Sequence, residues 1–207
     1  MLEILGRSTS INVRKVLWLC TELELPYRQE QWGTGFRSTD TAEFLALNPN
    51  GLVPVIRDGA FVLWESNTIC RYLAARHERD DLLPRELGSR ASVEQWMDWQ
   101  ATELNDAWRY AFMALVRKSP KHDDPSSIKA SIEQWNRRMT MLEAQLERTG
   151  AYVAGKAFTL ADVGIGLSTH RWFATPMDRP ALAAVEAYYQ RLSERAGFRE
   201  HGRNGSP

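Results

Sequence analysis

The hydrophobic pattern of the chain changes its period once, in the segment 80–88. Before this segment, short apolar runs of strand length alternate with stretches of helical spacing. After Ser89 the strand signals disappear, and apolar residues recur every three or four positions. Strands alternating with helices predict an α/β layer, whereas successive amphipathic helices predict a helical bundle. The sequence therefore predicts two domains of different class.

The first part predicts the element order βαβαββα, in which a small mixed sheet carries helices. Asp58-Gly59 separates two short apolar runs and predicts a hairpin between them. Pro26 follows the first helical segment and favours its end there. The predicted strands are residues 1–5, 27–31, 53–57 and 61–63, and the predicted helices are residues 13–23, 44–47 and 66–76.

The second part predicts only helices. Asp124-Pro125 provides a cap followed by a proline at the first helical position. Thr159-Leu-Ala-Asp162 is a capping box with Asp in place of Glu, which we interpret as structural. The predicted helices are residues 93–115, 125–146, 160–173 and 180–196. The predicted domains are residues 1–79 and 89–200, with a linker at 80–88 and a disordered tail at 201–207.

The composition excludes several classes of function. Lysine plus arginine equals aspartate plus glutamate at 26 each, without a long basic run, so nucleic acid and acidic membranes are not expected partners. No membrane span or signal peptide is evident, and the two cysteines, Cys20 and Cys70, fall on apolar helical stripes as buried thiols. These features favour the cytoplasm. The four histidines lack metal-ligand spacing, so no metal site is expected.

The segment 48–66 is the strongest local indication of a binding site. A loop ending in Val53-Pro54 enters the hairpin, and Glu65-Ser66 follows it at the start of a helix. This order predicts an exposed strand edge beside an acid and a hydroxyl, which suits a small peptide bound through its backbone and its charged end. Each part also has an ordinary interpretation, since Val53-Pro54 can be a simple turn and Ser66 a helix N-cap.

Ser8-Thr9-Ser10-Ile11-Asn12 joins the first strand to the first helix. Helix N-termini leave backbone N–H groups unpaired and attract anions. A hydroxyl at this position is either an N-cap or a hydrogen-bond donor to a substrate anion, and both interpretations stay open. No histidine lies nearby in the sequence, so a Ser-His-Asp nucleophile is not supported.

Taken together, these motifs resemble those of cytosolic glutathione transferases over nearly the whole chain. The residues that carry the resemblance are Ser10-x-Asn12-Val13, Asn48-Pro-Asn-Gly-Leu-Val53-Pro54, Asp58-Gly59, Leu63-Trp-Glu65-Ser66 and Thr159-Leu-Ala-Asp162. The resemblance implies a thioredoxin-like N-terminal domain that binds glutathione and an all-α domain that supplies much of the second-substrate pocket. It also implies a cis Pro54, a backbone pairing of Val53 with the cysteinyl part, and a γ-glutamyl end held by Glu65 and Ser66.

The placement of Ser10 resembles that in the serine-type classes, theta and phi, and their bacterial relatives, where this hydroxyl contacts the glutathione sulfur. Thr9 and Asn12 are rival candidates for that contact. Tyrosine-type relatives would have a tyrosine near position 7, where this chain has Arg7, and cysteine-type relatives a cysteine near position 10. The resemblance thus assigns Ser10, Asn12, Leu52, Val53, Pro54, Glu65 and Ser66 to glutathione.

Two positions depart from the family pattern at the glycyl end of glutathione. Many relatives have Gln or Lys where this chain has Leu52, and plant phi enzymes have a lysine near the position of Asp40. Arg7, Arg37 or a residue of the partner subunit could replace them. In the helical half, the resemblance suggests an electrophile pocket made by Trp108, Arg109, Phe112 and Met113, although Trp108 and Phe112 can equally be core residues.

The resemblance implies a homodimeric enzyme that ionises bound glutathione, its co-substrate, and transfers the thiolate to a hydrophobic electrophile. Two alternatives remain open at this stage. One is a protein of the same fold that binds glutathione or another ligand without turnover. The other is a glutathione-dependent peroxidase, because a bound thiolate can also reduce a peroxide.

Overall fold

The computed structural model describes residues 1–205 and 207, which form two compact units. The α/β unit comprises Met1–Pro84 together with residues 195–205, and the helical unit comprises Arg85–Glu194 with Pro207. The sequence placed residues 195–200 in the helical domain, whereas here they belong to the α/β unit. This assignment could not be read from local pattern, because it depends on contacts with residues far away in the chain.

The α/β unit has the order βαβαββα, as the sequence predicted. Its four-stranded sheet has the order β2-β1-β3-β4, with β1 and β2 parallel and the other neighbours antiparallel. The strands are β1 (Leu2–Leu5), β2 (Tyr27–Glu30), β3 (Val55–Asp58) and β4 (Phe61–Trp64), and the helices are α1 (Ile11–Glu22), α2 (Ala42–Leu45) and α3 (Ser66–Arg76). This is a thioredoxin-like arrangement.

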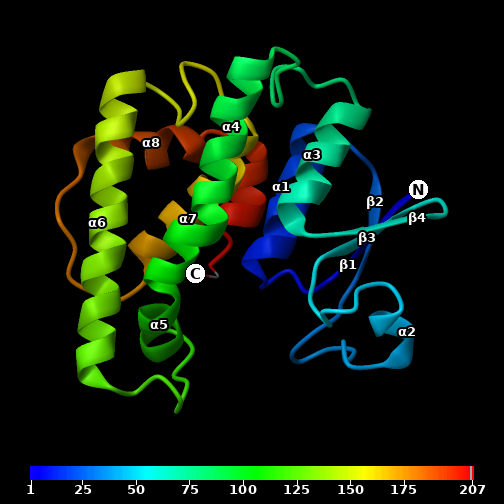
Figure 1. Cartoon of the computed structure of the whole chain (residues 1–207), viewed down its shortest axis with the longest axis horizontal. Coiled ribbons are helices and arrows are strands. Elements are labelled where there is room, and N and C mark those ends of the chain that lie inside the picture. The colour runs from blue at the N-terminus through cyan, green and yellow to red at the C-terminus, as the bar shows by residue number, and fades with distance from the viewer. Residues whose placement is uncertain (206) are drawn as a thin grey trace. The chain divides into compact units, whose positions relative to one another are not determined.

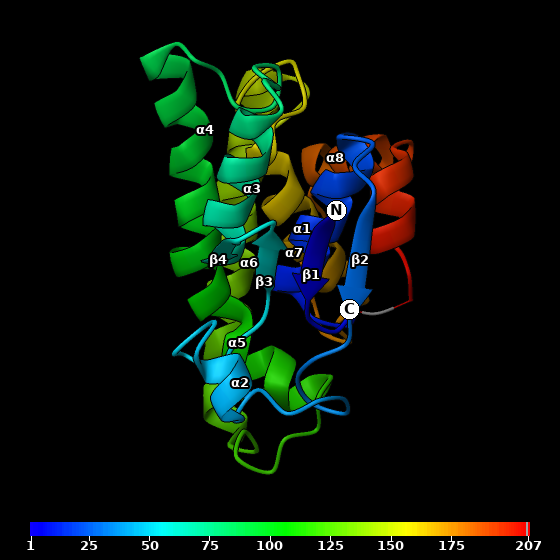
Figure 2. The same cartoon turned by 90° about the vertical axis from the view of Figure 1, so that its right-hand side faces the viewer.

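The two faces of the sheet are covered differently. Helices α1 and α3 pack against each other, and Figure 2 shows α1 behind β1. Short α2 carries Phe44, which is fully buried with Trp32, Leu5 and Val55. Alternate residues of a strand face the same side of the sheet. The polar residues Glu3 and Arg57 therefore lie on the α2 side together with Leu5 and Val55.

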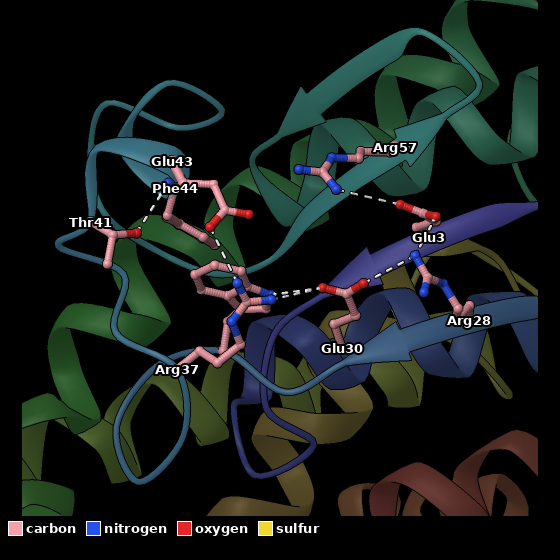
Figure 3. A network of polar contacts seen from close by, with 9 residues as sticks. Glu3, Arg28, Glu30, Arg37, Thr41, Glu43, Phe44 and Arg57 are labelled. Atoms are coloured by element: carbon pink, nitrogen blue, oxygen red, sulfur yellow. Dashed lines mark hydrogen bonds and ion pairs between the residues drawn. The ribbon is translucent and has the colours of Figure 1, made fainter.

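Those polar residues form a chain of alternating charges, shown in Figure 3. Glu3 lies between Arg57 at 3.6 Å and Arg28 at 2.6 Å, and the second of these arginines also contacts Glu30 at 3.0 Å. Arg37 continues the chain, 3.4 Å from Glu30 and 3.2 Å from Glu43 of α2. The chain thus connects three strands to the α2 segment. Because its arginines are partly exposed, each pair contributes little to stability.

The C-terminal segment packs against α1. A π-helical turn at Phe198–Gly202 contacts this helix, and the rings of Phe198 and Trp18 lie 5.0 Å apart. The sequence predicted disorder for 201–207, but His201 is 7% exposed and its Nε2 lies 3.0 Å from Thr21 Oγ1. That prediction is wrong for His201, whose burial depends on a residue 180 positions earlier. Ser206 lies outside the described residues.

The helical unit is arranged around α7 (Leu160–Ala174), which is buried along almost its entire length. Figure 1 shows α6 (Pro125–Thr149) running alongside α5 (Asn105–Leu115). The helix predicted at 93–115 is interrupted: α4 (Leu87–Trp99) passes through a π-helical turn, Gln100–Leu104, into α5. Helix α8 (Ala183–Ser193) completes the unit.

Helix α7 begins with the predicted capping box. The main-chain N–H and the hydroxyl of Thr159 both donate to Asp162 Oδ2, at 2.8 and 3.1 Å. The other oxygen, Oδ1, accepts from the main chain of Val153 at 3.0 Å and from the Tyr188 hydroxyl at 3.0 Å. Asp162 is fully buried, so its role is structural, as the sequence indicated. Among the helices of the described chain, none combines the length and the apolarity needed to cross a membrane.

Candidate functional site

One edge of the sheet gathers the predicted site residues of the α/β unit. Leu5 at the end of β1 pairs with Val55 at the start of β3, which in turn pairs with Trp64 at the end of β4. The loop to Ser10, the Val53-Pro54 peptide and the Glu65-Ser66 pair therefore all lie at the same end of the strands. We call this end of the sheet the site edge. Residues that are far apart in sequence become neighbours because of this register.

Gly6 allows the first helix to approach the Val53 loop closely. A Cβ atom at this position would lie 2.5 Å from Val13 Cγ2 and 3.1 Å from the Cβ of Val53. Its φ of +152° is also one that other residues rarely adopt. A side chain here would therefore separate the start of α1 from the Val53-Pro54 peptide.

Ser10 is the N-cap residue of α1, but its side chain does not cap the helix. Within the described part of the chain, its half-buried hydroxyl makes no hydrogen bond. The first turn of α1 also contains no acidic residue. The N–H groups of that turn and the Ser10 hydroxyl can therefore all donate to an anion from outside.

The neighbours of Ser10 have different environments. Thr9 is exposed, and Asn12 is half-buried on the first turn of α1. Sequence reasoning did not single out Ser8, which makes hydrogen bonds with Gln29 of β2 and with Gln31, which follows β2. Gln29 Nε2 donates to Ser8 Oγ at 3.1 Å, and Gln31 Nε2 donates to the same atom at 3.3 Å. These contacts fix the loop that carries Ser10. No sequence motif marks them.

Val53 has a main chain available for pairing. Its peptide bond to Pro54 is cis. Asn48 supports the preceding loop by donating to the carbonyl oxygen of Leu52 at 2.7 Å and accepting from the N–H of Asn50 at 3.1 Å. Considering residues 1–205 and 207, neither the N–H nor the C=O of Val53 takes part in a hydrogen bond. An extended peptide could pair with this main chain as an added strand.

Glu65 and Ser66 begin α3 in a different way from the predicted cap. Glu65, not Ser66, is the N-cap residue, and it has φ 71° and ψ 110°. A non-glycine residue with positive φ is strained, and such strain is concentrated at functional sites. Glu65 is exposed and its carboxylate does not cap the helix, while Ser66 is buried as the first helical residue.

The starts of α1 and α3 differ from the other helix starts. Within the described residues, α2, α4 and α6 are each capped by the side chain at their N-cap, namely Thr41, Glu86 and Asp124, and α7 begins with the capping box of Thr159 and Asp162. The start of α8 is covered by Glu143, whose two oxygens accept from the N–H groups of Ala184 and Val185 at 2.9 and 2.8 Å. Helix α5 continues from a π-helical turn and needs no cap. In the part of the chain that the structure describes, only α1 and α3, the two helices that begin at the site edge of the sheet, have starts without a side-chain acceptor.

The candidate residues for the glycyl end of glutathione lie around the same loops. Leu52 is 64% exposed, and Asp40 is exposed near Gly51. Arg37 is engaged with Glu30 and Glu43 and stacks 3.9 Å over the ring of Trp32 (Figure 3). These contacts make Arg37 the weaker of the two arginine candidates.

Arg7 lies closer to the Val53 peptide. Its Nη1 donates to the carbonyl oxygen of Thr34 at 3.3 Å. Both Arg7 and Val53 lie close to Gly33. A Cβ atom placed on Gly33 would be 3.6 Å from Arg7 Nη1 and 4.0 Å from Val53 Cγ2. A cationic side chain is therefore present beside the main chain that could pair with a peptide.

The four candidates for the electrophile pocket all belong to α5 in the helical unit. Trp108 and Phe112 are buried, 8% and 3% exposed, and Arg171 of α7 stacks over both rings at 4.3 and 4.0 Å. These two aromatic residues lie inside the unit. Arg109 is exposed and paired with Asp106 at 3.2 Å, and Met113 is half-buried. The pocket assignment stays a prediction.

Two cysteines and one lysine of the α/β unit are buried. Cys20 and Cys70 are buried free thiols, as the sequence indicated, and burial raises the pKa of each to about 12. Lys15 of α1, which sequence reasoning missed, is only 2% exposed. The described residues contain no cluster of three or more His, Cys, Asp or Glu side chains that could hold a metal ion.

Comparison with known proteins places this geometry in a family. A model described as "Glutathione S-transferase, N-terminal domain" matches residues 9–76. The chain is 38% identical over 202 residues to glutathione S-transferase GstB of Escherichia coli strain K12, covering 97% of both proteins. It is 31% identical over 209 residues to glutathione S-transferase 3 of Zea mays, covering 96% of this chain and 92% of the relative.

The fold is also similar to that of a solved glutathione S-transferase structure. The theta class glutathione S-transferase of the citrus canker pathogen Xanthomonas axonopodis pv. citri, solved with glutathione bound, superposes with a TM-score of 0.90 at 36% identity. The match covers 97% of this chain and 96% of that one. From its sequence identity and its fold, the chain belongs to the glutathione S-transferase family.

Proposed function

We propose that this glutathione transferase binds glutathione along the site edge and ionises its thiol with the hydroxyl of Ser10. The observation that carries the proposal is the pair of uncapped helix starts, α1 and α3, on either side of the unpaired Val53 main chain. A tripeptide with an anionic sulfur and a charged end would supply acceptors for the two helix starts and a hydrogen-bonding main chain for Val53. Membership of the family, and the glutathione in the related theta class structure, support this ligand.

Each part of glutathione has a complementary group. The cysteinyl main chain would pair with Val53 beside the cis Pro54. The γ-glutamyl end carries an ammonium and a carboxylate; the exposed Glu65 suits the first, and Ser66 with the start of α3 suits the second. The sulfur would then face Ser10 at the start of α1, with Thr9 and Asn12 as the rival contacts.

One hydroxyl and one helix start are energetically sufficient for ionisation. A thiol with a pKa of about 8.5 is only about 3% ionised near neutral pH. Lowering that pKa by about two units requires about 2.7 kcal/mol of preference for the thiolate. A hydrogen bond to a charged group contributes about 1.5–3 kcal/mol, and a helix N-terminus adds about 0.3–1 kcal/mol.

The chemical step follows from the thiolate. The sulfur lone pair forms a bond to the electrophilic carbon, and the electrons of the broken bond leave with the departing group or move onto a conjugated atom. The Ser10 hydroxyl donates a hydrogen bond to the sulfur and is not itself the nucleophile. We assign the electrophile to the helical unit, with Trp108, Arg109, Phe112 and Met113 as candidates for the pocket.

We further propose a homodimer located in the cytoplasm. Strand β4 is an edge strand of the sheet, and Phe61 and Trp64 on it are 47% and 37% exposed. Large apolar side chains on an open edge favour association with a second copy. The two free thiols suit a reducing compartment. Sedimentation at two protein concentrations tests the dimer, and a monomer at both would contradict it.

The decisive test combines turnover with the pKa of the bound thiol. We expect conjugation of glutathione to at least one class among aryl halides, epoxides and enones, followed spectroscopically. Ser10→Ala should raise the pKa of bound glutathione by about 1–2 units, measured from thiolate absorbance, because it removes a hydrogen bond to the anion. Thr9→Ala is the matched control and should leave that pKa unchanged.

Three results would count against this proposal. An unchanged thiol pKa in Ser10→Ala would remove this residue from the sulfur contact. Binding of glutathione without turnover on any electrophile would favour the ligand-binding alternative. Turnover restricted to hydroperoxides, included in the same panel, would favour the peroxidase alternative.

A further inference from the structure

A buried lysine connects the two helices that begin at the glutathione site. Lys15 of α1 is 2% exposed, and its Nζ lies 3.1 Å from the side-chain oxygen of Asn67. Lysine is almost never fully buried unless its ammonium has partners, because desolvating the charge is costly. An apolar residue would pack α1 against α3 without that cost. The presence of a lysine at this position therefore needs a reason other than packing.

The position of Asn67 suggests the reason. Asn67 follows Ser66 directly and is the second residue of α3. Lys15 lies in the same helix as Ser10, which precedes the first residue of α1. The contact thus joins the helix that begins at the proposed sulfur site to the first turn of the helix that begins at the proposed γ-glutamyl site.

The charge of Lys15 also acts within α3. Burial raises the pKa of the Cys70 thiol, and the nearby charges of Lys15 and Arg71 act in the opposite direction. The positive charge is therefore close to the residue one turn beyond Ser66. It adds to the partial positive charge of the uncapped start of α3, where an anion would bind.

We propose that Lys15 is a positioning residue of the glutathione site, which acts through Asn67 to hold the first turn of α3 in register with α1. With this contact intact, Ser66 and Ser10 are at the correct separation for the two ends of one tripeptide. The ammonium also favours the γ-glutamyl carboxylate electrostatically. This inference rests on the proposed function of the site and adds a residue to it.

The test measures affinity for S-methylglutathione by calorimetry, because this ligand has no ionisable thiol. We expect Lys15→Met to weaken binding by about tenfold or more and Asn67→Ala to weaken it less. Lys15→Arg keeps a cation and donors and should recover part of the loss. In the double variant of Lys15→Met and Ser66→Ala, the loss should be smaller than the product of the two single losses, since both act on one turn of α3.

A stability control separates positioning from general destabilisation. Val16→Ala removes buried volume from the same helix and should lower the unfolding temperature while leaving affinity close to that of wild type. If Lys15→Met does not fold, the affinities of Asn67→Ala and Lys15→Arg for S-methylglutathione are compared with that of the wild type instead. Wild-type affinity in Asn67→Ala then overturns the proposal.

The proposal is also overturned if folded Lys15→Met binds as wild type does, or if the Lys15 and Ser66 losses multiply independently. It is equally overturned if Val16→Ala weakens binding as much as Lys15→Met does. Failure of the wild-type protein to bind S-methylglutathione would instead refute the proposed function itself, and this inference with it.

Discussion

Arg195 and Glu22 form a two-pronged ion pair across 173 positions of the chain. Arg195 Nε lies 3.0 Å from one carboxylate oxygen of Glu22, and Nη2 lies 2.5 Å from the other. The indole N–H of Trp18 donates to the same carboxylate at 2.7 Å. The last turn of α1 is therefore fixed by the residue that begins the C-terminal segment of the α/β unit.

Removing this carboxylate should destabilise the α/β unit. Glu22→Ala leaves the Trp18 indole and the Arg195 guanidinium without their shared acceptor in a mostly buried place. We expect a loss of about 2–3 kcal/mol in the free energy of unfolding, measured with urea. Glu147→Ala, an exposed change on α6, serves as the control and should be nearly neutral. Equal stability of the two variants would contradict the role of Glu22.

Gly197 should not tolerate a side chain. A Cβ atom here would lie 2.2 Å from Trp18 Cδ1 and 2.8 Å from its Nε1, and Trp18 is fully buried. We expect Gly197→Ala to cost about 1–3 kcal/mol through overpacking. Gly88→Ala on α4 is the counterpart, because only the carboxylate of Glu86 lies nearby, 3.3 Å from its oxygen. Thermal unfolding should show a lower midpoint for the first variant only.

Ser66 should matter for affinity more than for stability. Its hydroxyl lies at the uncapped start of α3, where we place the γ-glutamyl carboxylate. Ser66→Ala should weaken glutathione binding by about 1.5 kcal/mol or more, which is about tenfold in Kd, as for a lost hydrogen bond to a charged group. Calorimetry with Thr68→Ala, an exposed neighbour, provides the reference. Undiminished affinity in Ser66→Ala would exclude the assignment.

Asp124 predicts a specific dependence of stability on acid. Hydrogen bonds from Ser127 and Ser126 lower the pKa of this N-cap carboxyl to about 2 from its ordinary value of 3.8. Because the folded-state pKa is the lower one, the contribution is present above about pH 4 and disappears as the pH falls toward about 2.

Asp124→Asn tests this directly, since asparagine also caps helices but does not titrate. We expect the wild type to lose stability relative to Asp124→Asn as acid is added below about pH 4, and to match it near neutral pH. Urea unfolding at several pH values measures the difference. Asp123→Asn, next to it in sequence, controls for the charge change. A constant difference over that range would refute the assignment.

The fold was largely predictable because its elements carry strong local patterns. The alternation in the first eighty residues gave the order of the sheet elements, and Asp58-Gly59 marked the hairpin. The π-helical turn within 93–115 could not be predicted, because the apolar spacing continues through it at almost helical period. The burial of His201 was equally unpredictable, since it depends on Thr21.

The site was partly predictable for a similar reason. Val53-Pro54 and Glu65-Ser66 are local motifs, and the sheet register explains why they share an edge with the loop to Ser10. The positive φ of Glu65 was not predictable, because glycine or asparagine usually occupies such positions. Nothing in the sequence indicated that Lys15 would be buried against Asn67, since a lysine on a helix is normally exposed.

The α/β unit is built from both ends of the chain, and this affects when it can fold during translation. Domains generally fold as they emerge from the ribosome, N-terminal first. Here the strands and helices up to Pro84 emerge early, but Phe198, which covers Trp18, follows only after the whole helical unit has been translated. The helix that carries Ser10 at its start thus remains uncovered on one side during most of translation. The packing around Trp18 is completed only after Phe198 has been added.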